Sequence, residues 1–172
     1  MLQTLKIANV ALIEQATLNF DEKLNVISGE TGAGKSIMLD SLSFVFGGRA
    51  DKTLIRTGAN SMKVEAIFTN LSKTHIEYIQ NNLNISCEDE MFLSRELDLN
   101  GRNICKINGE LVPVAVVKKV CSLLVDIHGQ TDHLAILNND EQLKIVDLFS
   151  KDVPELIEDL NCEIDKLKEI EK

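Results

Sequence analysis

The strongest restriction on the fold comes from one glycine-rich segment. Residues 29–36 read Gly29-Glu30-Thr31-Gly32-Ala33-Gly34-Lys35-Ser36 and match the phosphate-loop pattern GxxxxGK[ST] at every fixed position. Glycines let the backbone turn its N–H groups toward a phosphate, and the N-terminus of a following helix adds partial positive charge. Lys35 is expected to reach the β- and γ-phosphates, and the Ser36 hydroxyl to coordinate Mg²⁺. The sequence therefore predicts a nucleotide-phosphate site from Gly29 to Ile37.

The segments on both sides of this loop have the patterns of strands and a helix. Apolar residues 24–28 predict a short strand directly before the loop, and residues 2–7 and 13–20 predict two earlier strands. After the loop, apolar residues fall mostly on one side of a helix that ends at Gly47-Gly48. These apolar residues are Ile37, Leu39, Leu42, Val45 and Phe46.

The middle of the chain predicts more strands. Residues 63–68 alternate like a strand, and residues 72–82 have the pattern of a helix. From residue 91 to 112, strand-like stretches are separated by Asn100-Gly101 and Asn108-Gly109, and Asn-Gly is a strong hairpin signal. We therefore predict an α/β fold with a mixed sheet and an antiparallel meander.

The next segment leaves the chemistry open. A helix is expected from 113 to 120, followed by an apolar strand over 123–127. In one interpretation, Asp126 at the end of that strand coordinates Mg²⁺ as a Walker B carboxylate. In a second, Asp126-x-x-Gly129-Gln130 imitates the DxxGQ element of small GTPases, although the chain has no NKxD sequence. In a third, Gln130 is the Q-loop glutamine of an ABC-type ATPase, and these residues alone do not choose among the three.

The last part of the chain is expected to be a helical arm. From about residue 140 the sequence is acidic, and its apolar residues follow the 3-4-3 spacing of a coiled-coil seam. The pattern covers barely two heptads, so periodicity alone equally allows an ordinary amphipathic helix. We therefore divide the chain into an N-terminal lobe, residues 1–140, and an arm, residues 141–172. The seam residues are Ile157, Leu160, Ile164 and Leu167.

Composition argues against several other classes. The 172 residues are 44% hydrophobic and 26% charged, which is ordinary for a globular chain. No apolar stretch approaches the roughly 18 residues of a membrane helix, and no secretory signal is recognisable, so a cytoplasmic protein is expected. Four cysteines without a CxxC pair argue against a disulfide framework or a zinc site. His128 and His133 lack the spacing of paired metal ligands on a helix.

The charge balance does not indicate a polyanion partner. There are 18 Lys and Arg residues against 27 Asp and Glu, a net charge of −9. A local basic face remains conceivable, but scattered solvated charges are the better interpretation because no charge run supports it. Its candidate residues are Arg95, Arg102, Lys106, Lys118 and Lys119.

Three stretches resemble the recombination protein N family of DNA repair ATPases, which are related to the structural maintenance of chromosomes (SMC) proteins. They are LKIANVALIEQATLNFDEKLNVISGETGAGKSIMLDSLSFVFGGRAD, LIRTGA and VDIHGQTDH. The resemblance implies an ABC-type ATPase head divided between the two ends of a longer chain and joined by a coiled coil. This chain resembles the N-terminal half of that head with the root of the coiled coil.

The resemblance also implies roles for individual residues. It favours Gln130 as the Q-loop glutamine, which acts with Lys35 in catalysis and with Ser36 in holding the Mg²⁺ of ATP. It gives Arg56 a role similar to that of the arginine-loop residue of SMC heads, with Arg49 as the weaker candidate, and it puts Asn9 near the base.

The expected function is ATP binding in a DNA double-strand break repair protein, with hydrolysis once the C-terminal half of the head is present. The resemblance implies a homodimer whose heads sandwich ATP, DNA as a partner of the full-length protein, no membrane, and association with the nucleoid during repair. The chain departs from the family pattern because it has no LSGG-like signature and no second apolar strand ending in Asp-Glu. One alternative is a self-sufficient small P-loop NTPase or kinase that uses Asp126 for Mg²⁺, and another is an interaction module whose seam binds a partner helix.

Overall fold

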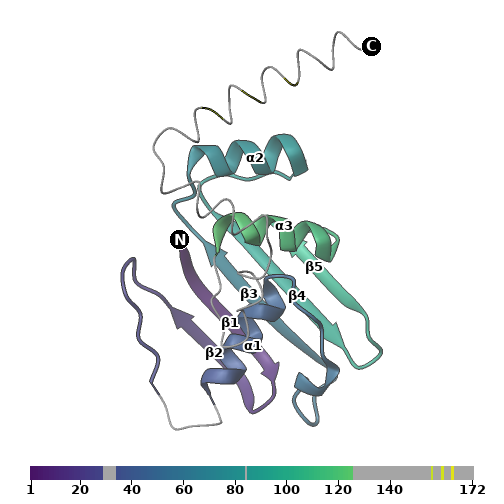
Figure 1. The fold of residues 1–172 in the computed structure, drawn as a ribbon. Helices are drawn as coiled ribbons and strands as arrows, with labels where there is room; N and C mark the ends of the chain where they lie inside the picture. Colours follow the sequence, from purple (N-terminus) through teal and green to yellow (C-terminus); the bar gives the residue numbers. More distant parts are fainter. Residues whose placement is uncertain (29–33, 84, 126–155, 157–159, 161–163, 165–172) are drawn as a thin grey trace. The chain divides into compact units, whose positions relative to one another are not determined.

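A computed structural model describes residues 1–28, 34–83 and 85–125, together with Leu156, Leu160 and Ile164. The chain divides into two compact units, Met1–Asp126 and Ile127–Lys172. The first unit contains one sheet and the helices that cover it (Figure 1). In the second unit, the three described residues are helical and exposed. The division predicted from the sequence, a lobe of residues 1–140 and an arm of residues 141–172, remains a prediction.

The sheet has six strands in the order β2-β1-β3-β4-β5-β6, and every pairing is antiparallel. The meander predicted from the two Asn-Gly pairs is confirmed as β4, β5 and β6. At the second turn, Asn108 and Gly109 both have positive φ, +49° and +86°, as a type I′ hairpin turn requires. The strands are β1 (Leu2–Val10), β2 (Ile13–Asn19), β3 (Ser61–Phe68), β4 (Met91–Asp98), β5 (Asn103–Ile107) and β6 (Glu110–Leu111).

Alternating burial along the strands gives the sheet one covered face. On β3, four residues of one face are almost inaccessible to solvent, whereas the residues between them are exposed or half-buried. Strands with one buried face alternate in this way. Helices α1 (Lys35–Val45) and α3 (Val114–Leu124) pack against the covered face, and α2 (Lys73–Leu83) packs on α3. The four buried residues of β3 are Met62, Val64, Ala66 and Phe68.

Helix α1 ends where the sequence predicts. The Gly48 amide donates to the Ser43 carbonyl over 2.8 Å, and the Gly47 amide donates to the Phe44 carbonyl over 3.2 Å. This is a Schellman motif, and Gly47 supplies its left-handed residue with φ of +94°. The predicted start of α2 is also confirmed, because the Ser72 hydroxyl accepts from the His75 amide over 3.2 Å.

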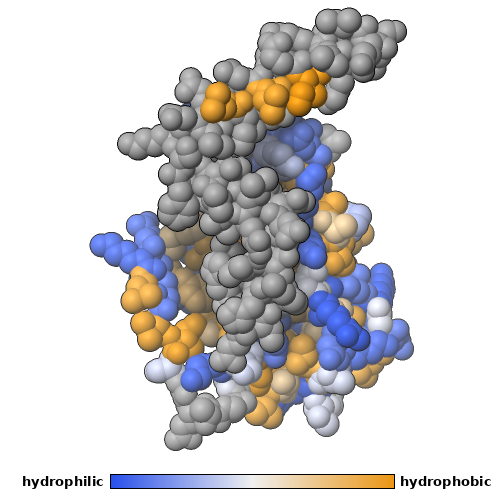
Figure 2. All heavy atoms as spheres, in the orientation of Figure 1, coloured by the Kyte–Doolittle hydropathy of each residue, from blue (hydrophilic) through white to orange (hydrophobic). Residues whose placement is uncertain are grey.

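The expectation of a mixed sheet is wrong for the described residues. Residues 24–28, predicted as a strand, form none there, so no parallel pairing arises. Their side chains are instead exposed, with Leu24 at 85%, Val26 at 78% and Ile27 at 45%. Figure 2 shows apolar side chains at the surface on the left, where Figure 1 draws the segment after β2.

Two further expectations are wrong. Leu123 and Leu124 belong to helix α3 rather than to a strand, because a short apolar run fits a buried helix end as well as a strand. Leu39 was expected on the buried side of α1 but is 58% exposed. The buried side is formed by Ile37, Ser41 and Val45, which follow one another at intervals of four residues, and Leu39 does not fit that spacing. No described helix is long and apolar enough to cross a bilayer.

Candidate nucleotide site

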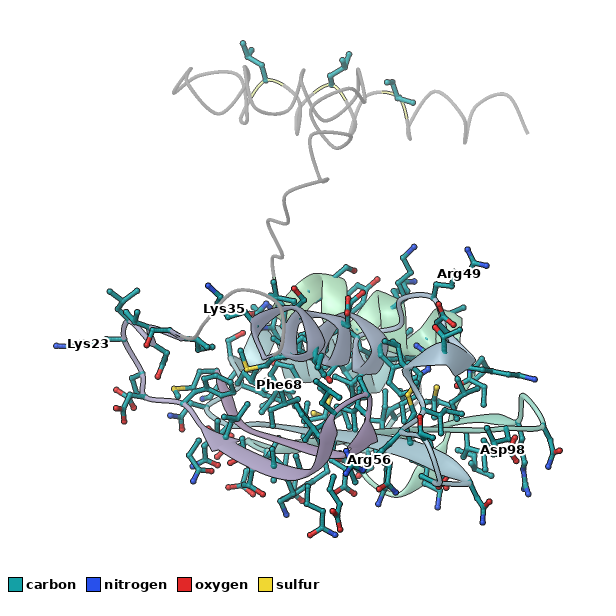
Figure 3. The ribbon with its side chains drawn as sticks, turned by 90° about the horizontal axis from the view of Figure 1, so that it is seen from below. Lys23, Lys35, Arg49, Arg56, Phe68 and Asp98 are labelled. Atoms are coloured by element: carbon teal, nitrogen blue, oxygen red, sulfur yellow. The ribbon has the colours of Figure 1, made fainter. Side chains whose placement is uncertain are left out.

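The N-terminal end of α1 presents the last residues of the phosphate loop to solvent. Lys35 and Ser36 are exposed in the first turn of the helix, and Figure 3 shows Lys35 at that end. Gly34 is the N-cap, so no side chain caps the helix, and the first turn contains no acidic residue. The first N–H groups of a helix lack partners within it and carry partial positive charge. Amides, an ammonium group and a hydroxyl therefore converge here, which suits a phosphate and its Mg²⁺.

Gly34 supports this assignment. Its φ is −116°, a value that other residues adopt readily, and a Cβ added there would meet nothing within 4 Å. Neither backbone conformation nor packing inside the described protein therefore requires glycine at this position. A physical reason for glycine at position 34 is then that a ligand approaches the backbone closely there.

Several predicted site residues lie outside the described residues. They are Gly29, Glu30, Thr31, Gly32, Ala33, Asp126 and Gln130. Ile37 is described, and its side chain is only 8% exposed in the core below α1. Ile37 therefore has only its backbone amide to offer a nucleotide.

A second group of predicted residues meets at the turn between β1 and β2. The Ala11 amide donates to the Leu54 carbonyl over 2.6 Å, and the Arg56 amide donates to the Asn9 carbonyl over 3.0 Å. Asn9 and Ala11 have positive φ, +57° and +48°, which is uncommon outside glycine. Backbone hydrogen bonds thus join the segment that carries Arg56 to this turn.

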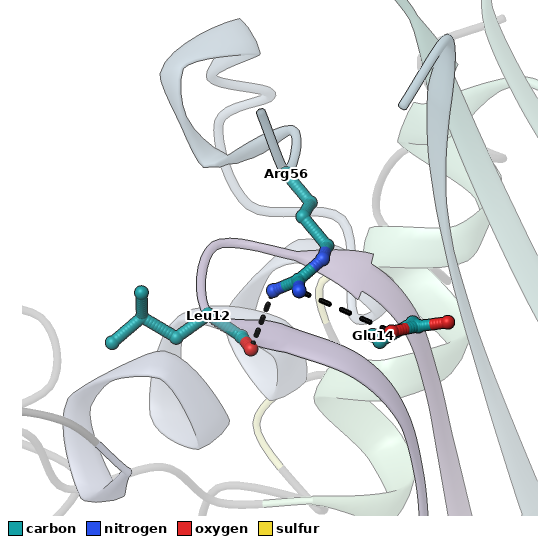
Figure 4. Close-up of polar contacts among 3 residues, drawn as sticks. All are labelled: Leu12, Glu14 and Arg56. Atoms are coloured by element: carbon teal, nitrogen blue, oxygen red, sulfur yellow. Dashed lines mark hydrogen bonds and ion pairs between the residues drawn. The ribbon is translucent and has the colours of Figure 1, made fainter. Parts of the chain in front are cut away.

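The Arg56 side chain adds to this attachment. Its Nη1 donates to the Leu12 carbonyl over 2.7 Å, and its Nη2 lies 3.9 Å from the Glu14 carboxylate (Figure 4). An open groove of about 520 Å³ lies beside it, so the structure brings Asn9 and Arg56 together. The groove is lined by Asn9, Glu14, Arg56, Thr57, Gly58, Ala59, Asn60 and Ser61.

The structure does not bring Lys35 to these groups. Lys35 is not among the residues that line the groove, and Figure 3 shows Lys35 and Arg56 well apart. Arg49 lies beyond the opposite end of α1, as Figure 3 also shows. An eleven-residue helix is about 16 Å long, so Arg49 is too distant to contact a phosphate held at Lys35.

The candidate basic face does not form. Arg95 is 2% exposed and lies in the core. Lys106 is exposed on β5 between buried Cys105 and Ile107, so it points away from the face that α3, with Lys118 and Lys119, covers. The interpretation as scattered solvated charges is therefore wrong for Arg95, which is buried, and Lys106 does not share a face with Lys118 and Lys119. No group of three metal-ligating side chains occurs within the described part of the chain.

The phosphate-loop sequence and the helix that follows it are those of a P-loop domain. A family model described as an AAA domain matches residues 4–172, and the chain belongs to this AAA domain family. Among curated relatives it is similar to the DNA repair protein RecN of Halalkalibacterium halodurans, with 38% identity over 152 residues, and to RecN of Bacillus subtilis, with 36% identity over 151 residues. These matches confirm the resemblance to the recombination protein N family.

Only part of each relative is matched. Both alignments cover 87% of this chain, but 27% of the first relative and 26% of the second. The chain therefore spans about a quarter of the length of the RecN proteins it matches.

Solved structures share the fold at low sequence identity. An Smc head domain with an extended coiled coil from Pyrococcus furiosus matches with a TM-score of 0.70 and 21% identity, covering 99% of this chain and 46% of that one. A structure from work on ATP-driven dimerization of SMC ATPases matches with a TM-score of 0.63 and 20% identity, covering 87% of this chain and 99% of that one. The head-type fold predicted from the sequence is confirmed by these neighbours.

Proposed function

We propose that this chain binds ATP with Mg²⁺ through residues 29–37 and forms the N-terminal half of an ATPase head in a DNA repair protein. The observation that carries the proposal is the uncapped N-terminus of α1, where Lys35 and Ser36 are exposed at the end of a complete phosphate-loop sequence. When bound, Mg²⁺ would neutralise phosphate charge, with Ser36 as one ligand and Gln130 as a second. Similarity to RecN supports the assignment to DNA repair.

The exposed segment 24–28 has the character of a binding surface. Three large apolar side chains are solvent-exposed directly before the phosphate loop, and an exposed apolar patch marks an interaction site. We assign the C-terminal half of the head as its partner, with residues 24–28 forming a strand once that half is present. The C-terminal half would then bind next to the phosphate loop and complete the ATPase head.

The complete site is expected to need two heads. Each composite site would take Lys35, Ser36 and Gln130 from one head and a signature motif from the other, and closure on ATP would be the mechanical step. Arg56 would act near the nucleotide from the segment that is hydrogen-bonded to the β1–β2 turn. Leu156, Leu160 and Ile164 are helical and exposed, which supports an arm that begins a coiled coil with a partner segment. DNA would be bound by the full-length protein, in the cytoplasm and on the nucleoid.

Calorimetric titration with ATP and Mg²⁺, with GTP alongside, tests ATP binding. Lys35→Ala is expected to weaken ATP binding at least roughly tenfold, because a charge-assisted contact to phosphate is lost. Lys23→Ala removes a lysine that is also exposed but lies outside residues 29–37, and it serves as the control. Equal ATP affinity in wild type and Lys35→Ala would contradict the proposal.

A turnover assay on the same samples separates half a head from the alternative. The half-head proposal expects little hydrolysis by the isolated chain and an increase when the C-terminal half is added. A self-sufficient NTPase would instead show steady turnover by the isolated chain, lost in Asp126→Ala. Neither RecN similarity nor the helical position of Leu123 and Leu124 favours that alternative.

A further inference from the structure

Arg95 is a buried cation that holds the C-terminal end of α1. It projects from the covered face of β4 and is 2% exposed. Its Nη1 donates to the Phe44 carbonyl over 2.5 Å and to the Gly48 carbonyl over 2.8 Å, while its Nε donates to the Asn103 side chain over 2.9 Å. The guanidinium carbon also lies 4.4 Å from the centre of the Phe44 ring. One side chain thus joins α1, β4 and β5.

The charge of Arg95 is compensated by the helix. No carboxylate lies within ion-pair distance of this guanidinium among the residues that the structure describes. The last carbonyl groups of a helix are unpaired within it and carry partial negative charge. Burial lowers the pKa of Arg95 from its ordinary value, which reflects the desolvation cost of placing this group in the core. An apolar side chain would avoid that cost, but it would leave the buried Phe44 carbonyl and the partly buried Gly48 carbonyl without this donor.

The opposite end of the same helix carries the phosphate-binding residues. Lys35 and Ser36 occupy its first turn, and α1 is a single uninterrupted helix of eleven residues. A displacement or rotation of its C-terminal end therefore moves its N-terminal end as well. Among the described residues, the side-chain hydrogen bonds between β4 and the end of α1 are those of Arg95.

We infer that Arg95 is a positioning residue, which sets the placement of α1 on the sheet and thereby the geometry of the phosphate site at its other end. The inference rests on the proposed ATP binding at residues 29–37. Arginine suits the role because its planar fork of donors binds two carbonyl groups and the Asn103 amide oxygen at once. Lysine keeps the charge, but its donors sit on a single nitrogen, whereas Arg95 uses Nε for Asn103 and Nη1 for the two carbonyl groups.

The test compares Arg95→Lys with Ile79→Ala in the full chain. Ile79 is fully buried on α2, which packs on α3, so its truncation destabilises the protein away from α1. MgATP affinity is measured by calorimetry well below each variant's Tm, and amide hydrogen exchange is measured without nucleotide. Arg95→Lys is expected to weaken MgATP binding roughly 3- to 30-fold and to speed exchange selectively in α1. Ile79→Ala is expected to leave MgATP affinity unchanged while it lowers the Tm.

A milder variant covers the case in which Arg95→Lys does not fold. Asn103→Ala removes only the acceptor of Nε and leaves the two carbonyl contacts, so we expect a smaller loss of MgATP affinity in the same direction. Unchanged affinity and unchanged α1 exchange in the folded variants would overturn the inference. Equal loss of affinity in Ile79→Ala would also overturn it, because general destabilisation would then explain the effect. If wild type fails to bind MgATP, the proposed function fails, and α1 exchange alone decides the role of Arg95.

Discussion

The Arg56 guanidinium donates a hydrogen bond to the backbone carbonyl of Leu12 over 2.7 Å, across 44 positions of sequence. This contact fixes the side of the groove on which Asn9 also lies. Because the backbone of the Arg56 segment is already fastened to the same turn, the side chain is not needed to hold the loop in place. Under the proposed function, this side chain would contact the bound nucleotide.

Arg56→Ala should separate binding from stability. Both members of its ion pair with Glu14 are solvent-exposed to a large extent, at 35% and 78%, and such pairs contribute about 0–1 kcal/mol. We expect the free energy of unfolding in urea to fall by no more than about 1 kcal/mol, while MgATP affinity falls roughly tenfold. Glu14→Gln removes the ion pair alone and should keep MgATP affinity. An equal loss in Glu14→Gln would indicate that the pair, rather than an arginine–nucleotide contact, matters.

Val26→Asp should block assembly of the head without unfolding the lobe. Val26 is 78% exposed, so the replacement costs little stability in the isolated chain. If residues 24–28 pair with the C-terminal half, burying an unpaired carboxylate there should weaken co-purification of the two halves at least roughly tenfold. Leu99→Asp, at a 54% exposed position after β4, provides the matched control. Undiminished co-purification of Val26→Asp would assign the partner to another surface.

Gly47→Ala should destabilise the lobe more than Gly58→Ala. Both glycines have positive φ, +94° and +92°, so each replacement costs about 1–2 kcal/mol in conformational strain. At Gly47 the added Cβ would also lie 3.0–3.1 Å from the Cβ and backbone of Lys118, whereas at Gly58 it would meet nothing within 4 Å. We expect a loss of about 2–4 kcal/mol for Gly47→Ala from urea unfolding. Similar losses for the two variants would show that α1 and α3 can separate without cost.

The stability of the lobe should fall in alkaline solution. Burial raises the pKa of Cys121 from 9.0 to about 12, so the folded protein keeps a proton that the unfolded chain releases above pH 9. The contribution of Cys121 is therefore complete below pH 9 and is lost as pH rises toward 12, by about 1.4 kcal/mol per pH unit for one such group. Urea unfolding at pH 8, 9.5 and 10.5 measures the slope. Cys121→Ala should reduce the slope without abolishing it, because burial also raises the pKa of Cys87 and of Cys105. An unchanged slope would exclude Cys121 as a source.

Features encoded within a few residues were predictable from the sequence. The glycine stop of α1 and the Asn-Gly turns act through local backbone preferences, and both predictions are confirmed. The phosphate loop is also encoded locally, and its role in binding stays a prediction. The family resemblance, carried by long stretches of sequence, was confirmed by the relatives. The grouping of Asn9 and Arg56 in one groove could not be predicted from spacing, because it depends on how a loop docks on a distant turn.

The wrong predictions share a physical cause. The apolar runs at residues 24–28 and 123–127 indicate that these side chains favour burial. They do not indicate whether the segment forms a strand or a helix, or what it packs against. The first run is exposed here and the described start of the second is helical. Arg95 is buried although arginine is usually exposed, and no local signal marks a guanidinium that binds carbonyl groups at the end of a helix about 50 residues earlier.

The order of strands has a consequence for synthesis. Apart from β1 with β3, every pairing joins strands that are consecutive in the chain, so each new strand finds its neighbour already made. By the time α3 leaves the ribosome, both edges of the sheet and the helices over its covered face exist. Short-range pairing of this kind lowers the entropy lost in closing loops and favours folding during translation. The sheet and the three helices can therefore fold while the segments that follow α3 are still being made.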